Sequence, residues 1–300
     1  MKIIVTGSLG HISKPLAQDL IQKGHSVTVI SSKPERQAAI EALGAAAAIG
    51  SMEDAGFLAA AFAGADVVYA MEALGAGSFY DPDLDFGAAN TQIGRNYKKA
   101  IQQSGIKQVV HLSSIGAHME SGNGILAFHY NVEKILNELP DDVAIKFMRP
   151  VGFYYNMFAY IPIIQKQGAI IQNYGGNERE PWVSPLDIAR VIAEEIERPF
   201  EGRTVRYIAS DEASPNELAA ILGNAIGKPE LEWKVITDAQ LLNNLVAAGM
   251  NPKTARGFVE MNAARRGGVL YEDYYRNQPV PGTVKLKDFA KEFAAAFFKS

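Results

Sequence analysis

The chain contains no cysteine, which excludes disulfide bonds, thiolate nucleophiles and zinc sites built on cysteine. It has no apolar run approaching the roughly 18 residues that suggest a membrane span, and Ile3 to Val5 is too short for the apolar core of a secretion signal. Neither sign of charge is in large excess, since the formal net charge is −4 at pH 7. We therefore expect a soluble, cytoplasmic protein that binds neither nucleic acid nor membrane.

Metal-ligand patterns are missing as well. His25, His111 and His118 stand at no ligand spacing with carboxylates, so we predict no metal site. The sequence has no internal repeat and no obvious large apolar surface stripe, which leaves a monomer or a weak homodimer as the expected state. What the chain has in quantity is apolar residues: 48% of 300 positions are hydrophobic, enough for a large core.

The most informative segment is the N-terminus. A short apolar run, Ile3 to Val5, leads into Thr6, Gly7 and Gly10, and a helical pattern opens at about Lys14. A strand, a glycine turn and a helix in this order are typical of a dinucleotide-binding site, in which the helix N-terminus faces a pyrophosphate. Ser13 stands where a third glycine is usual, and its side chain is expected to cap the helix.

Strands and helices alternate through the first half of the chain. We predict strands at 27–30, 46–49, 67–71, 108–113 and 144–148, and helices at 57–62, 86–104 and 128–139. Ser32 to Glu35 has the pattern of a capping box that begins another helix. This alternation predicts a doubly wound parallel sheet.

The second half is mainly helical. We expect helices at 185–198, 215–226, 238–248, 252–265 and 286–299, with short strands only near 205–209 and 231–235. Residues 1–150 would form the dinucleotide-binding domain and 151–300 a smaller substrate lobe. Part of that lobe, about 180–210, would return to the sheet.

Several short motifs together resemble a known family. Thr6-Gly7-x-x-Gly10 is followed by His111-Leu-Ser113-Ser114, by Glu133 on a helix, by Arg149-Pro150-x-Gly152-Phe153-x-x-Asn156, and by Asp187 after Trp182 to Ser184. Their order resembles the NmrA-like branch of the atypical short-chain dehydrogenase/reductases. The resemblance covers essentially the whole chain. It implies a Rossmann fold with a small C-terminal lobe and an NADP-type cofactor.

The end of the second strand bears on the choice of cofactor. Enzymes that use NAD usually place a carboxylate there to hold the ribose 2′-hydroxyl, whereas this strand ends Ile30-Ser31-Ser32-Lys33. Hydroxyl groups and a cation suit a 2′-phosphate better, so we predict NADP, with NAD as the alternative. Members of the family often have arginine at the position of Ser32 and aspartate at that of Ser51, and this chain departs at both.

Two patterns compete for the catalytic helix. Tyr130-x-x-x-Lys134 matches the Tyr-x-x-x-Lys pair of active short-chain reductases. The resemblance instead places His129, four residues before Glu133, where the family has lysine, and Ile125 where the tyrosine would stand. The two patterns differ by one residue, or about 100° around the helix. We favour His129 as the residue that faces the cofactor and keep the Tyr130–Lys134 pair as the alternative.

The remaining candidates follow from the expected carboxyl edge of the sheet and from the aromatic cluster after Arg149-Pro150. The substrate candidates are Glu72, Phe79, Tyr80, Tyr154 and Asn156, although the aromatic cluster is equally interpretable as the contact between the lobes. The cofactor candidates are Thr6, Gly7, Leu9, Gly10, His11, Ile12, Ser32, Lys33, Ser51, Met71, Ser113, His129 and Phe153.

Three functions remain open at the level of the sequence. The first, which we prefer, is an NAD(P)H-dependent reductase of a quinone or a similar flat acceptor. The second is a protein that senses NADP(H) and regulates a partner without turnover. The third is a nucleotide-sugar epimerase or related isomerase, which would need Tyr130 and Lys134 to face the cofactor.

Overall fold

A seven-stranded parallel sheet forms the centre of the molecule. The computed structural model describes residues 1–299, and it orders the strands β10-β6-β5-β4-β1-β2-β3. The strands are β1 (Lys2–Val5), β2 (Ser26–Ser31), β3 (Ala46–Ile49), β4 (Val67–Ala70), β5 (Gln108–Leu112), β6 (Ala144–Pro150) and β10 (Arg203–Ile208). The strand order reverses between β1 and β4, which is where ligands bind in sheets of this kind. The prediction of a doubly wound parallel sheet is confirmed.

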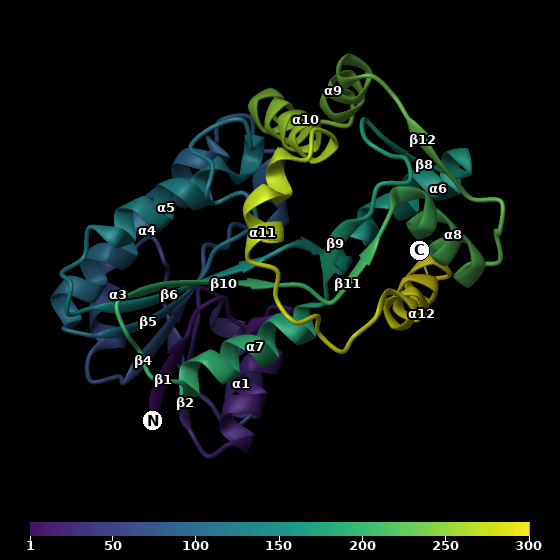
Figure 1. Ribbon diagram of the computed structural model, residues 1–300. Helices are drawn as coiled ribbons and strands as arrows, with labels where there is room; N and C mark the ends of the chain where they lie inside the picture. Colours follow the sequence, from purple (N-terminus) through teal and green to yellow (C-terminus); the bar gives the residue numbers. More distant parts are fainter. Residues whose placement is uncertain (300) are drawn as a thin grey trace.

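Helices cover both faces of this sheet (Figure 1). On one face lie α1 (Ser13–Gln22) and α7 (Pro185–Glu197); on the other lie α3 (Ala55–Phe62), α4 (Phe86–Ser104) and α5 (Ala127–Asn137). The short α2 (Gln37–Glu41) packs against β3. Because both faces are covered, the strands read as continuous apolar runs, as in Ile3-Ile4-Val5.

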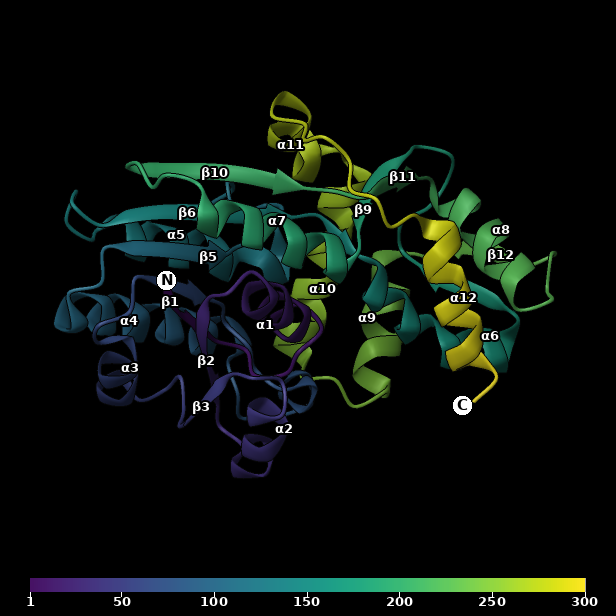
Figure 2. The ribbon, with the colours of Figure 1, turned by 90° about the horizontal axis from the view of Figure 1, so that it is seen from below.

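The C-terminal lobe lies beside the carboxyl edge of the sheet. Its helices are α6 (Ile161–Gln167), α8 (Pro215–Ala225), α9 (Asp238–Ala247), α10 (Pro252–Arg266), α11 (Glu272–Arg276) and α12 (Leu286–Phe297). Figure 2 shows α6, α8 and α12 grouped at the end of the molecule away from β1 to β3, with α10 between the two parts. Residues 185–208 provide α7 and β10, so this stretch belongs to the layers of the large sheet.

Two features of the second half differ from the sequence prediction. The lobe contains α6 and more strands than expected: β7 (Gly152–Phe153), β9 (Glu180–Val183) and β11 (Asp211–Ala213) form one small sheet, and β8 (Ala169–Gln172) pairs with β12 (Glu232–Val235). The additional strands are two to four residues long and pair with distant segments, so local patterns did not reveal them. No helix within residues 1–299 is both long and apolar enough to cross a membrane.

Candidate active site

The glycine turn lies at the carboxyl end of β1. Thr6 is buried, and its Oγ1 accepts a hydrogen bond from the backbone N–H of Met71 at 2.9 Å, which ties the ends of β1 and β4 together. Gly7 has φ of +84°, and a Cβ there would lie 2.5 Å from both Met71 Sδ and Ser13 Oγ. Only glycine fits this position without displacing its neighbours.

Helix α1 begins at Ser13 with no side-chain cap on its N-terminus. The expectation that Ser13 caps the helix is wrong: its hydroxyl lies in the interior, 3.6 Å from Met71 Sδ. Gly10 is exposed. A Cβ added there would have one atom within 4 Å, the carbonyl oxygen of Gly7 at 3.1 Å. Because Gly10 is exposed and no side chain caps α1, the first N–H groups of the helix are free of a side-chain partner, and this arrangement fits the pyrophosphate of a dinucleotide.

The other candidates in this turn differ in what they can offer. Ile12 is buried and Leu9 packs against the same core cluster, so only their backbone groups face the turn. His11 is exposed, and its ring lies 3.8 Å from that of Tyr155.

The tip of β2 carries a small hydroxyl cluster. Ser31 Oγ accepts hydrogen bonds from Ser8 Oγ at 2.9 Å and from the backbone N–H of Lys33 at 3.2 Å. The side chains of Ser32 and Lys33 are exposed. The capping role predicted for Ser32 is wrong: the segment after it is the short 3-10 helix η1 (Pro34–Arg36), which has Lys33 at its N-cap position and no side-chain cap.

Ser51 follows β3, and its Oγ accepts a hydrogen bond from the backbone N–H of Glu53 at 3.1 Å. This contact shapes the turn after β3, beside the tip of β2. With Ser8, Ser31, Ser32 and Lys33 it places hydroxyl groups and one cation where the adenosine half of a dinucleotide would lie.

At the carboxyl ends of β4 and β5, a carboxylate and an imidazole form a buried pair. Glu72 follows β4, His111 is on β5, and His111 Nε2 lies 3.1 and 3.2 Å from the two carboxylate oxygens of Glu72. Neither side chain is exposed to solvent. Glu72, predicted to contact substrate, thus faces His111 in this structure. His111 belongs to the His-Leu-Ser-Ser motif, but nothing in the sequence indicated its partner.

Helix α5 presents a polar inner face. Glu133 accepts hydrogen bonds from Ser113 Oγ at 2.5 Å, from Arg149 Nε at 2.9 Å and from Arg149 Nη2 at 2.6 Å. Burial alone would lower the pKa of the Arg149 guanidinium, but the carboxylate of Glu133 raises it well above its usual value. This network fixes α5 against β5 and β6.

His129 lies one helical turn before Glu133, and its Nδ1 is buried with no hydrogen-bond partner among the described residues. The Phe128 ring lies 3.9 Å from the imidazole. Burial, with a further contribution from His111, lowers the pKa of His129 to about 3, so the ring is neutral near pH 7. Tyr130 is half-buried and Lys134 is exposed. The structure therefore does not bring Lys134 to the inner face that holds Glu133.

The aromatic candidates divide between the two lobes. Tyr154 is buried in the C-terminal lobe, where its hydroxyl donates to the carbonyl oxygen of Val284 at 3.1 Å, and Asn156 is exposed. Phe79 contacts the rings of Phe86 and Phe258, while Tyr80 is exposed. Phe153 and Met71 are partly buried against the core on the α1 side of the sheet.

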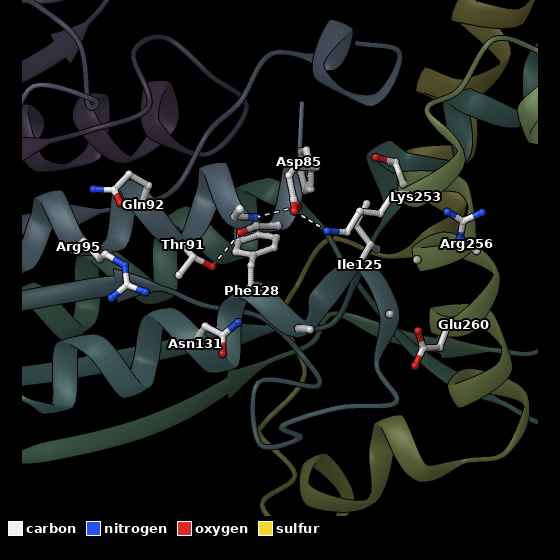
Figure 3. A pocket seen from close by; sticks show the side chains of 17 residues that line it. Asp85, Thr91, Gln92, Arg95, Ile125, Phe128, Asn131, Lys253, Arg256 and Glu260 are labelled. Carbon is white, nitrogen blue, oxygen red and sulfur yellow. Dashed lines mark hydrogen bonds and ion pairs between the residues drawn. The ribbon is translucent and has the colours of Figure 1, made fainter. Parts of the chain in front are cut away.

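Two pockets border this region. One of about 210 Å³ lies between the glycine turn and the C-terminal lobe and is lined by His11, Tyr154, Tyr155, Phe158 and Phe289, among others. A larger pocket of about 760 Å³ lies between α4, α5 and α10, where Lys253 reaches Asp85 (Figure 3). No group of three or more side chains suited to a metal ion occurs within residues 1–299.

The family model of NmrA-like proteins matches residues 1–268 of the chain. The chain belongs to the NmrA-like family. The resemblance drawn from the motifs is confirmed, and with it the Rossmann architecture.

Solved structures similar to this NmrA-like chain share its fold. The NADPH-dependent quinone oxidoreductase QOR2 of Escherichia coli, complexed with NADPH, has a TM-score of 0.79 at 20% identity and covers 97% of this chain and 99% of its own. The triphenylmethane reductase of Citrobacter sp., complexed with NADP(H), has a TM-score of 0.75 at 20% identity, and the match covers 97% of this chain and 99% of the reductase.

One curated relative is similar in sequence. It is the 4-hydroxy-2-methyl-3-oxo-4-farnesyl-3,4-dihydroquinoline-1-oxide ketoreductase of Stigmatella aurantiaca, 30% identical over 114 residues. The match spans 38% of this chain and 34% of the relative's length.

Proposed function

We propose that this NmrA-like protein is an NADPH-dependent reductase that transfers hydride to a quinone or a similar flat acceptor. The observation that carries the proposal is the glycine turn, exposed at Gly10 and closed to any side chain at Gly7, at the point where the strand order reverses. The names of the similar proteins support it, since they are reductases of a quinone, a triphenylmethane dye and a dihydroquinoline oxide.

Different residues would bind the pyrophosphate, the 2′-phosphate and the nicotinamide of the cofactor. The first N–H groups of α1, with Gly7 and Gly10, would hold the pyrophosphate. The exposed Ser32 and Lys33 would hold the 2′-phosphate through hydroxyl and ammonium donors, and the hydrogen bonds of Ser31 Oγ with Ser8 and with the backbone N–H of Lys33 would fix the turn that carries them. Met71, Ser113 and Phe153 would surround the nicotinamide. When bound, NADPH supplies the hydride, and the protein provides orientation, exclusion of water and a proton.

We assign the cofactor-facing position on α5 to His129. It lies on the helix face of Glu133, which contacts Ser113 at the end of β5, and its buried Nδ1 has no partner among the described residues. Lys134, the other candidate, is exposed. A neutral imidazole can accept a proton on one nitrogen and donate one from the other.

Turnover tests this assignment. We expect purified protein to oxidise NADPH in the presence of a quinone, His129→Ala to lower kcat/KM at least about tenfold, and Tyr130→Phe to leave it within about twofold. Absorbance of NADPH at steady state measures all three. Tight NADPH binding without turnover on any acceptor would favour the sensing function, and loss of activity in Tyr130→Phe alone would favour the other register.

Cofactor choice gives a second prediction. Lys33→Glu is expected to weaken NADPH binding about tenfold or more, because it replaces a donor to the 2′-phosphate with a repelling charge. NADH, which lacks that phosphate, should bind with nearly unchanged affinity. Titration by intrinsic fluorescence measures both dissociation constants, with Lys299→Glu as a control for the same charge change on the C-terminal lobe. Equal weakening of both cofactors would contradict the role of Lys33.

A further inference from the structure

The smaller pocket, of about 210 Å³, has no role in the binding scheme above. His11 of the glycine turn forms one side of it, and the other sides come from η4 (Tyr154–Tyr160), the start of α7 and α12. Phe153, proposed to lie beside the nicotinamide, directly precedes Tyr154. The pocket therefore adjoins the proposed cofactor site. It is smaller than the roughly 300–1,000 Å³ of sites that enclose a drug-sized molecule, so it would hold one group of a ligand rather than the whole.

Aromatic rings form most of the wall of this pocket, and they pack against one another. The ring of Phe289 lies 5.3 Å from that of Tyr154 and 5.2 Å from that of Phe158, and the rings of Tyr155 and Phe158 are 5.3 Å apart. Tyr154 and Phe289 are buried, whereas Tyr155 is 43% exposed at the opening. A group bound here would meet aromatic side chains from both η4 and α12.

Backbone hydrogen bonds fix the part of the wall formed by Val284. Its carbonyl oxygen accepts from the Tyr154 hydroxyl at 3.1 Å, and its N–H donates to the buried Asp187 at 3.0 Å. Asp187 also accepts from the N–H of Thr283 at 3.1 Å. The wall is thus held in place before any ligand binds, which lowers the entropy cost of binding.

The charge of the pocket is negative. Glu292 lines it, no lysine or arginine within residues 1–299 does, and the exposed Glu292 carboxylate has no hydrogen bond or ion pair in that range. Burial raises the pKa of the Tyr154 hydroxyl, and the nearby carboxylates of Asp211, Asp187 and Asp288 raise it further. Aromatic rings beside a free carboxylate attract organic cations, and the same carboxylate repels anions.

We propose that this pocket binds a positively charged ammonium or iminium group on the acceptor, so that the preferred substrate is a flat organic cation. The proposal rests on the function proposed above and names the class of its substrate. Glu292 would select for positive charge, and the ring of Tyr155 would contact the charged group. A neutral quinone lacks this contact, so it would be reduced with a higher KM.

Direct binding tests the pocket without requiring turnover. The probes are phenyltrimethylammonium and tert-butylbenzene, which share a shape and differ by one charge, titrated into the 300-residue chain with and without NADP⁺ and followed by ligand NMR. The variants are Glu292→Gln and Tyr155→Leu. The matched control is Glu230→Gln, because Glu230 is an exposed carboxylate of the same lobe that lies outside the pocket.

We expect wild type to bind the ammonium probe at least about tenfold more tightly than the uncharged probe. Glu292→Gln should weaken binding of the ammonium probe about two- to fivefold and leave that of tert-butylbenzene unchanged, as an exposed ion pair predicts. Tyr155→Leu should reduce the ratio of the two affinities, and Glu230→Gln should match wild type. Equal binding of both probes to wild type, or no change in Glu292→Gln, overturns the proposal.

A kinetic comparison separates this proposal from the reductase itself. The acceptors are two naphthoquinones, one with a trimethylammoniomethyl group and one with the uncharged neopentyl group in its place. Wild type should have the lower KM for the charged quinone, and Glu292→Gln should reduce that difference without lowering kcat. NADPH oxidation with no preference for the charged quinone overturns the cation pocket alone. Preferential binding of the ammonium probe without oxidation of NADPH by either quinone supports the pocket and overturns the proposed reductase.

Discussion

Arg149→Met is expected to lower the free energy of unfolding by about 3–5 kcal/mol, because it leaves a buried carboxylate without its partner. Glu133 accepts two hydrogen bonds from the guanidinium, and its side chain is only 8% exposed. Arg149 Nη1 also donates to Tyr207 Oη at 3.2 Å and to Asp273 Oδ2 at 3.1 Å. The substitution therefore affects α5, β6, β10 and α11 together.

Chemical denaturation followed by circular dichroism measures this loss. Arg276→Met is the matched control, since its ion pair with Glu272 is exposed on both sides and should contribute less than about 1 kcal/mol. Adding Glu133→Leu to Arg149→Met should restore part of the stability, because no unpaired charge then remains on α5. A loss no larger than that of the control would show that the network does not hold the helix.

This network illustrates what the sequence could and could not predict. Glu133 and the Arg149-Pro150 motif were both recognised, yet their contact joins α5 to β6, and Asp273 joins from 124 residues away. Such contacts depend on which elements become neighbours. The Glu72–His111 pair was not predicted for the same reason, because it forms only once β4 and β5 lie side by side.

Local sequence signals predicted the ends of helices correctly where capping residues determine those ends. The range of α4 was predicted in full, and the helix has Asp85 as its N-cap and Gly105, with φ of +75°, as its C-cap. Ser214 with Glu217, and Thr237 with Gln240, form capping boxes with reciprocal hydrogen bonds at the starts of α8 and α9. At Ser32 only the capping role was wrong: Ser31, one residue earlier, accepts the N–H of Lys33, and the chain enters the 3-10 turn η1, which continues directly into α2 without a side-chain cap.

Gly7→Ala is expected to cost about 2–5 kcal/mol of stability and to weaken NADPH binding roughly tenfold to hundredfold. A side chain at φ of +84° is strained, which accounts for about 1–2 kcal/mol. The added Cβ would also lie 2.5 Å from Met71 Sδ and Ser13 Oγ, so the ends of β4 and α1 must move. That movement displaces the N–H groups proposed to hold the pyrophosphate.

Alanine variants at Gly24 and Gly10 separate the backbone strain from the effect on NADPH binding. Gly24 has the same φ of +84°, but an added Cβ there would have no atom within 4 Å, so Gly24→Ala should cost only the strain and leave NADPH binding intact. Gly10→Ala should instead weaken binding with a smaller loss of stability than Gly7→Ala, because its Cβ would have one close contact, the carbonyl oxygen of Gly7 at 3.1 Å, on an exposed residue where the pyrophosphate is proposed to bind. Thermal unfolding and NADPH titration of the three variants measure both effects. If Gly7→Ala matched Gly24→Ala in both, the glycine turn would be a structural feature alone, and the proposed cofactor site would have to lie elsewhere.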